Sequence, residues 1–275
     1  MFGKLLKHEM RATRRLMLPI FGLLLAFSVL FVVMLWLNPG PSGEGIQFGT
    51  LQGGFMADAG NMLIAIFTIL ITMGYVFMNI AAVTVIFFYA IVRFRSNLLG
   101  DEGYFMHTLP VTAGANLWAK VIASTLWLVL GGAAILLSSM VVGAGAGGLS
   151  FFQELGEVIR LGFNAATARV FWLLAEVLLL LLAGTVNWFL TVYAAMSMGY
   201  SLQKHRGVVS ICIYFAINFA EQIVMMQGVS VLSWLGLFPE TPEALMLMLT
   251  GYLAVTSVGW HFLARYFLSR RLNLQ

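Results

Sequence analysis

Residues 16–37 read LMLPIFGLLLAFSVLFVVMLWL, a stretch without a single charged side chain. A helix needs about 20 apolar residues to cross the hydrocarbon core of a bilayer. Further stretches of this kind occupy residues 61–92, 121–148, 170–203, 207–227 and 244–264. The sequence therefore predicts an all-α, polytopic membrane protein with six transmembrane helices.

The composition excludes a soluble protein. Apolar residues make up 61% of the 275-residue chain and charged residues only 9%, against about 25% in a typical soluble domain. The connections between the apolar stretches are short and leave no room for a soluble domain. We therefore expect a single transmembrane domain over residues 1–275, so that any soluble catalytic domain belongs to another chain.

The Lys and Arg residues predict the orientation. All of the 15 except Arg160 and Arg169 lie in the N-terminal segment, the second or fourth connection, or the C-terminal segment. Because cytoplasmic connections carry an excess of cations, both termini are expected in the cytoplasm. The net charge of +4 then reflects orientation in the membrane, and no nucleic-acid partner is predicted.

Two short amphipathic helices and a hairpin are expected beside the spans. Residues 2–15 have cations on one face and apolar groups on the other, which is typical of an interfacial helix that contacts lipid on the cytoplasmic leaflet. Glu9 lies on the apolar face, so we expect a protein neighbour there. On the outer side, Ser150 is expected to cap a second helix, and residues 229–238 are expected to dip into the membrane as a hairpin.

The sequence contains no recognisable catalytic or metal site. It has no G-x-x-x-x-G-K-[ST] loop and no HExxH motif. Ser197 and His261 would be the candidate residues of an intramembrane serine protease. The sequence around Ser197, AMSMG at residues 195–199, lacks the first glycine of G-x-S-x-G, and we expect Ser197 to bond to its own helix. Asp101, Glu102 and His107 do not have ligand spacing. We therefore predict no catalytic residue, metal or cofactor in this chain.

Two carboxylates within the predicted spans are candidates for a translocation path. Glu176 and Glu221 are costly in a membrane, where such groups line pathways or form buried pairs. Asn187 and Gln222 are polar candidates in the same spans. The alternative is a structural role, with Arg169 as a partner for Glu176. Both interpretations stay open.

The connection between the second and third spans has the features of a docking surface. Residues 100–106 read GDEGYFM, so glycines bracket an acidic pair and bulky apolar groups follow. Thr112 is placed to cap the next helix. Apolar groups beside acids on an exposed segment suggest a partner protein. The alternative is a segment folded onto the membrane surface.

These residues resemble the permease subunits of bacterial type-two ABC exporters. The likeness is carried by the opening MFGKLLKHEMRA at residues 1–12 and by NLLGDEGYFMHTLPV at residues 97–111. The layout of an N-terminal interfacial helix, six spans and an outer hairpin before the last span is also similar. The likeness extends along essentially the whole chain.

The resemblance implies a division of labour between subunits. A separate ABC ATPase would bind ATP and magnesium, and this chain would be no enzyme. It would translocate cargo across the bacterial cytoplasmic membrane, as a dimer with itself or a paralogue. Asp101 and Glu102 would supply polar contacts to the ATPase and Tyr104 an apolar anchor. The implied coupling loop consists of Gly100, Asp101, Glu102, Gly103 and Tyr104.

The cargo and two other functions remain open. Counted from Arg169 and Arg206, Glu176 and Glu221 fall in the outer half of the bilayer. Together with the apolar path they suggest an amphipathic or cationic cargo such as a peptide or drug. The first alternative is a proton-coupled secondary transporter that uses Glu176 or Glu221. The second is a non-transporting membrane scaffold or sensor.

Overall fold

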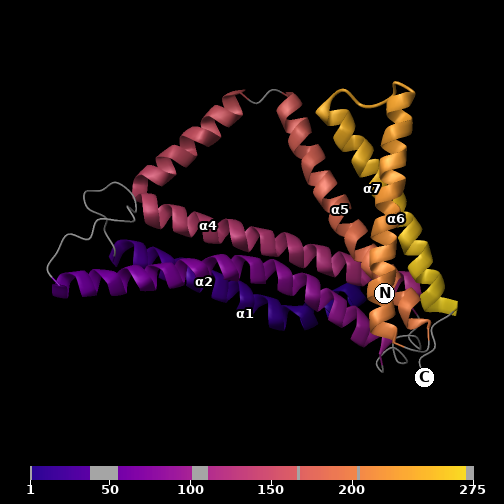
Figure 1. Cartoon of the computed structure of the whole chain (residues 1–275), viewed down its shortest axis with the longest axis horizontal. Coiled ribbons are helices and arrows are strands. Elements are labelled where there is room, and N and C mark those ends of the chain that lie inside the picture. The colour runs from indigo at the N-terminus through magenta and orange to yellow at the C-terminus, as the bar shows by residue number, and fades with distance from the viewer. Residues whose placement is uncertain (1, 38–54, 101–110, 166–167, 203–204, 271–275) are drawn as a thin grey trace. The chain divides into compact units, whose positions relative to one another are not determined.

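The computed structural model describes residues 2–37, 55–100, 111–165, 168–202 and 205–270. Within these ranges the chain is helical and contains no strand (Figure 1). The α-helices are α1 (Phe2–Leu37), α2 (Phe55–Phe94), α4 (Ala113–Ala165), α5 (Ala168–Tyr200), α6 (Arg206–Trp234) and α7 (Pro242–Arg270), and a π-helical turn, η1 (Arg95–Leu99), follows α2. Among the described residues, six helices are long and apolar enough to cross a membrane, which indicates a multi-pass membrane protein.

Two helices continue where a break is expected from the sequence. α1 is one continuous helix, so no break separates residues 2–15 from the first predicted span. α6 continues to Trp234, and the expected hairpin over residues 229–238 is therefore wrong. Residues 229–234 contain no helix breaker, and the chain turns only near Gly236, where φ is +67°.

The helix expected after residue 150 is present, but Ser150 does not cap it. The break falls at Gly148, whose φ of +57° is non-helical, and the helix then continues to Ala165. Figure 1 shows the resulting bend of α4. The Ser150 hydroxyl donates a hydrogen bond to the Gly147 carbonyl at 2.7 Å. Ser150 already lies within the helix, two residues after the break, and no amide of the described residues donates to its hydroxyl, as a cap would require.

The chain forms two compact units, and their boundaries fall within α1, α2 and α4. Unit 1 comprises Met1–Ala12, Phe87–Leu126 and Ala166–Gln275, and unit 2 comprises Thr13–Ile86 and Trp127–Ala165.

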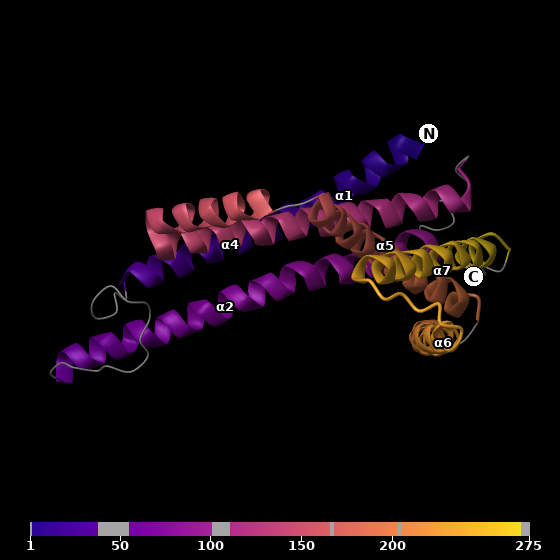
Figure 2. The same cartoon turned by 90° about the horizontal axis from the view of Figure 1, so that it is seen from above.

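In unit 2, three helices pack around a small apolar core. Leu24 of α1, Ala82 of α2 and Ala134 of α4 form this core, and the three helices run beside one another in Figures 1 and 2. The Trp36 indole donates a hydrogen bond to the Gly145 carbonyl at 2.7 Å. A Cβ at Gly145 would overlap a side chain of α1, so a glycine permits this close approach.

In unit 1, the second half of α5 forms the core. Almost every residue from 187 to 200 is buried, and α6 and α7 pack directly against α5. Phe94 at the end of α2 stacks on Tyr193 of α5, with ring centroids 4.1 Å apart. α5 thus holds the end of α2 and the start of α4, which flank the connection that the sequence singles out.

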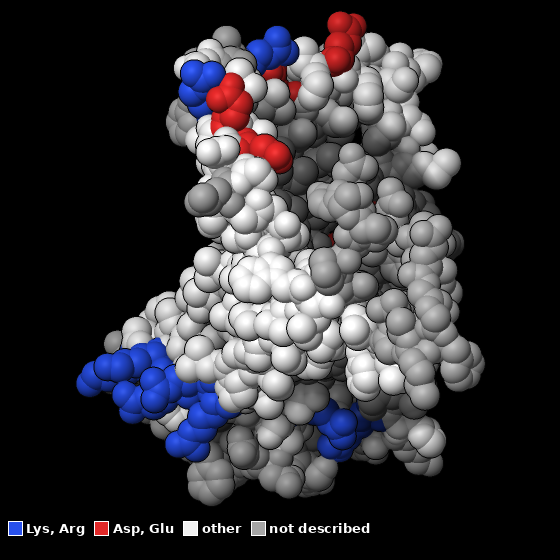
Figure 3. Space-filling view, turned by 90° about the vertical axis from the view of Figure 1, so that its left-hand side faces the viewer, with Lys and Arg blue, Asp and Glu red and all other residues white. Residues whose placement is uncertain are grey.

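The start of α1 carries an exposed positive face. Glu9 is buried, whereas five cations on the other face are exposed. They are Lys4, Lys7, Arg11, Arg14 and Arg15. On the face drawn in Figure 3, Lys and Arg side chains at lower left form a patch that contains no Asp or Glu side chain. The amphipathic pattern predicted for residues 2–15 therefore agrees with the observed burial.

Candidate functional site

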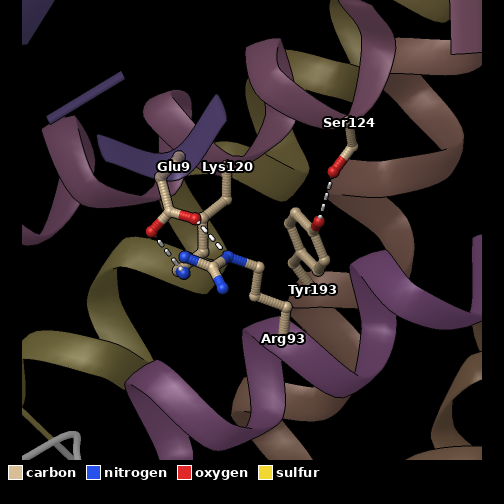
Figure 4. A network of polar contacts seen from close by, with 5 residues as sticks. All are labelled: Glu9, Arg93, Lys120, Ser124 and Tyr193. Carbon is tan, nitrogen blue, oxygen red and sulfur yellow. Dashed lines mark hydrogen bonds and ion pairs between the residues drawn. The ribbon is translucent and has the colours of Figure 1, made fainter. Parts of the chain in front are cut away.

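A buried carboxylate joins three helices in unit 1. Glu9 of α1 is 2% exposed. Its Oε2 accepts a hydrogen bond from Arg93 Nε of α2 at 2.5 Å, and its Oε1 accepts one from Lys120 Nζ of α4 at 3.0 Å (Figure 4). We call Glu9, Arg93 and Lys120 the Glu9 cluster. The expectation that Glu9 has a protein neighbour is confirmed.

The electrostatics of the Glu9 cluster follow from its burial. The side chains of Glu9 and Lys120 are 3% and 4% exposed, and that of Arg93 is 17% exposed. Removing such charges from water costs several kcal/mol for each ion, and only close, hydrogen-bonded partners offset this cost. The carboxylate is therefore held ionised between two cations. This arrangement fixes one register of α1 against α2 and α4.

A second polar contact links the same region to α5. The hydroxyl groups of Ser124 and Tyr193 lie 3.3 Å apart, close to the Glu9 cluster (Figure 4). Tyr193 is fully buried and also stacks on Phe94, the residue after Arg93. The ends of α2 and α4 are thus held both by ion pairs and by packing on α5.

Two residues of the Glu9 cluster belong to the helices that flank the 101–112 connection, Arg93 seven residues before Gly100 and Lys120 eight residues after Thr112. Arg93 precedes η1, which buries Leu98 and Leu99 and ends at Gly100 in an extended conformation. On the other side, the Ala115 amide donates to Thr112 Oγ1 at 3.3 Å, which confirms Thr112 as the cap of α4. π-helical turns are often found at functional sites. Of the predicted coupling loop, Gly100 is described and residues 101–104 lie outside the described residues.

The structure brings two of the four path candidates to the same helix. Asn187 Nδ2 donates to the Leu253 carbonyl at 3.3 Å and to Thr256 Oγ1 at 2.8 Å, both on α7. Glu221 Oε1 accepts a hydrogen bond from Trp260 Nε1 of α7 at 2.6 Å. Asn187 therefore has a structural role in joining α5 to α7, and Glu221 has a partner within the protein.

The other two path candidates are not part of that contact. Within the described residues, Oε2 of Glu176 is buried and has no hydrogen-bond partner, and the side chain of Gln222 is exposed. Arg169, named as a possible partner in the structural alternative, does not bond to Glu176. Arg169 Nε instead bonds to Glu243 Oε1 of α7 at 2.5 Å. Arg169 and Glu176 are seven residues apart on α5, which corresponds to about 10 Å along the helix. Glu243 at the start of α7 is near enough to bond to Arg169.

No catalytic constellation or metal site is found in the described ranges. Ser197 is buried and its hydroxyl donates to the Tyr193 carbonyl at 2.7 Å, as expected for a serine bonded to its own helix. His261 packs against Trp118, with ring centroids 5.3 Å apart. In the part of the chain that is described, no group of three His, Cys, Asp or Glu residues could hold a metal.

The sequence interpretation missed the partners of Glu9 and a pocket nearby. One signal was available, since Lys120 follows the apolar residues LWA and precedes VIAS, where a cation requires a partner. The pocket, of about 300 Å³, lies between the end of α2, η1, α5 and α6, and Arg95 is among its lining residues. No pattern within a single segment predicts it.

The chain matches no model of a protein family, no curated protein and no solved structure in the comparisons made with each. A function must therefore be argued from the residues and their geometry.

Proposed function

We propose that this chain is the transmembrane permease subunit of an ATP-driven, type-two ABC exporter. The observation that carries the proposal is the Glu9 cluster, which ties the N-terminal helix to both helices that flank the 101–112 connection. That connection, together with Gly100 before it, contains the Gly-Asp-Glu-Gly-Tyr sequence, which is part of the resemblance. A partner protein that binds this connection would therefore act on helices that the Glu9 cluster holds together.

The Glu9 cluster prevents α2 and α4 from moving separately. A push on a connection moves the attached helices only if its two ends do not yield separately. Arg93 and Lys120 share one carboxylate, and separating either from Glu9 would leave a buried charge without this partner. ATP binding and hydrolysis on the partner ATPase would therefore displace α1, α2 and α4 together. In two such chains, this motion would open and close a path for the cargo.

The distribution of charge in unit 1 supports cytoplasmic termini. Arg95, Arg206 and Arg265 lie in η1 after α2, at the start of α6 and near the end of α7. The opposite end of α5 and α7 carries the ion pair of Arg169 with Glu243. An excess of cations at one end is what the positive-inside rule requires of the cytoplasmic side. η1, which precedes the predicted ATPase-binding connection in the chain, lies at the same end.

Copurification tests the proposal directly. The tagged chain is isolated from native membranes in mild detergent, and the proteins that accompany it are identified by mass spectrometry. We expect a stoichiometric soluble protein with a phosphate-binding loop. The double change Asp101→Lys and Glu102→Lys should abolish its recovery, because the acidic pair would supply the polar contacts.

A matched control replaces two exposed acidic residues of another segment by lysine. Glu154 and Glu157 are exposed on the second part of α4, so the double change Glu154→Lys and Glu157→Lys should leave recovery of the ATPase unchanged. Absence of any ATPase in several detergents would contradict the proposal. Equal recovery with the Asp101/Glu102 variant would exclude the coupling role of that pair.

A proton-coupled transporter is the second candidate, and one observation favours it. Oε2 of Glu176 is buried without a hydrogen-bond partner in the described chain, and carboxylates within membrane spans are typical of proton relays. Uptake by vesicles separates the two functions. A coupled carrier would respond to a pH gradient without ATP and would lose this response in Glu176→Gln. A scaffold would show no flux under either condition.

A further inference from the structure

The pocket of unit 1 is lined on one side by aliphatic residues, and on this side it is open at the exposed face of α6. Its volume is about 300 Å³, and Ile91, Val192 and Ile211 contribute to its lining. Ile211 is 57% exposed, so this side faces whatever surrounds the helix. In a multi-pass membrane protein the surroundings at such a surface are lipid chains. The pocket is therefore accessible to an apolar chain from the bilayer.

The polar groups of the pocket carry positive charge or can donate hydrogen bonds. Arg95 Cζ lies 5.9 Å from the centroid of the Tyr200 ring, and the Arg95 side chain is exposed. None of the described carboxylates forms an ion pair with Arg95, and within the same ranges the Tyr200 and Tyr214 hydroxyls have no hydrogen-bond partner. Among the described residues that line the pocket, none is acidic. An anion with hydrogen-bond acceptors complements this set.

We propose that this pocket binds an anionic phospholipid of the surrounding bilayer. The phosphate would lie at Arg95, whose planar guanidinium suits phosphate oxygens, and part of one acyl chain would occupy the aliphatic side. A volume of about 300 Å³ is at the lower end for ligand pockets, so it accommodates part of a chain and no whole lipid. Basic pockets between membrane helices are known sites for lipid headgroups. This proposal does not depend on the presence of an ATPase.

Fluorescence quenching by brominated lipids tests the proposal on the full chain. Trp188 lines the pocket, and its signal is isolated as the difference between the wild-type protein and Trp188→Phe. The protein is reconstituted in phosphatidylcholine vesicles that contain a small fraction of brominated phosphatidylglycerol. A parallel series contains phosphatidylcholine with the same brominated chains. We expect the anionic lipid to quench Trp188 half-maximally at about tenfold lower mole fraction, as expected for one charge-assisted contact.

Three variants separate the pocket from general attraction between the protein and anionic lipid. Arg95→Gln should abolish the preference for phosphatidylglycerol. Arg11→Gln removes an exposed cation from the start of α1 and should retain the preference. Gly207→Leu should reduce quenching by both lipids, because a Cβ there meets nothing within 4 Å and the longer side chain can enter the pocket.

Specific outcomes would overturn the proposal. These are equal quenching by the two lipids, an unchanged preference in Arg95→Gln, or loss of the preference in Arg11→Gln. Adding inorganic phosphate to the quenching assay distinguishes a lipid headgroup from a free anion. If millimolar phosphate removes the quenching by phosphatidylglycerol, the site binds a free anion and the role of the acyl chain is refuted. Persistence of quenching in phosphate supports binding of the lipid.

Discussion

Replacing Glu9 by Gln tests the Glu9 cluster most directly. The change keeps the size of the side chain and one carbonyl acceptor, but it removes the negative charge between Arg93 and Lys120. Lys120 is only 4% exposed, so its ammonium group cannot regain full hydration. We therefore expect Glu9→Gln to destabilise unit 1 through the loss of a counter-charge at a buried cation.

The magnitude follows from the burial of the pair. Removing one partner of a buried ion pair costs about 3–5 kcal/mol. At about 2–4 °C for each kcal/mol, the unfolding temperature should fall by about 6–20 °C. The measurement is thermal unfolding of the purified chain in detergent. The second change Lys120→Met in the Glu9→Gln background should recover much of the loss, because an apolar residue requires no counter-charge.

A matched substitution at an exposed ion pair provides the control. Glu157 bonds to Arg160 at 2.7 Å, but the two side chains are 51% and 67% exposed. Exposed pairs contribute little, so Glu157→Gln should change the unfolding temperature by no more than about 2 °C. The reasoning is refuted if Glu9→Gln behaves like this control, or if Lys120→Met adds its own loss to that of Glu9→Gln.

Three further outcomes are expected. Gly199→Ala should destabilise the chain by about 1–3 kcal/mol, because the new Cβ would lie 2.7 Å from backbone atoms of Ser210; Gly184→Ala on the same helix has its nearest contact at 4.0 Å and should be neutral or stabilising in the same thermal assay. Asn187→Ala should lower the unfolding temperature as well, since two hydrogen bonds to α7 are lost from a buried site, at a cost of about 1–3 kcal/mol. Glu221→Gln keeps an acceptor for the indole of α7 and should preserve stability while reducing vesicle transport; normal flux would assign Glu221 a structural role.

The features that the sequence predicts correctly depend on residues close to one another in the chain. The apolar stretches predict the long helices because the length and apolar composition of each stretch are sufficient to identify it. Thr112 is identified as a cap because it bonds to an amide three residues away. Ser150 shows where such local reasoning fails, since Gly148 already ends the preceding helix and the hydroxyl finds a different partner.

The features that the sequence does not predict depend on residues far apart in the chain. The burial of Glu9 is indicated by its place on an apolar face, but its partners lie 84 and 111 residues away. The same holds for Arg169, which bonds to a carboxylate 74 residues away and not to the one on its own helix. The pocket beside Arg95 combines residues of separate helices.

The position of the Glu9 cluster bears on how force would pass from a partner to the membrane helices. An exposed ion pair would yield easily, because water replaces each partner at little cost. A buried carboxylate shared by two cations resists separation, because any opening exposes charge to an apolar surrounding before water can reach it. A partner that binds the 101–112 connection would accordingly move the segments of α1, α2 and α4 that carry Glu9, Arg93 and Lys120 together before it could pull them apart.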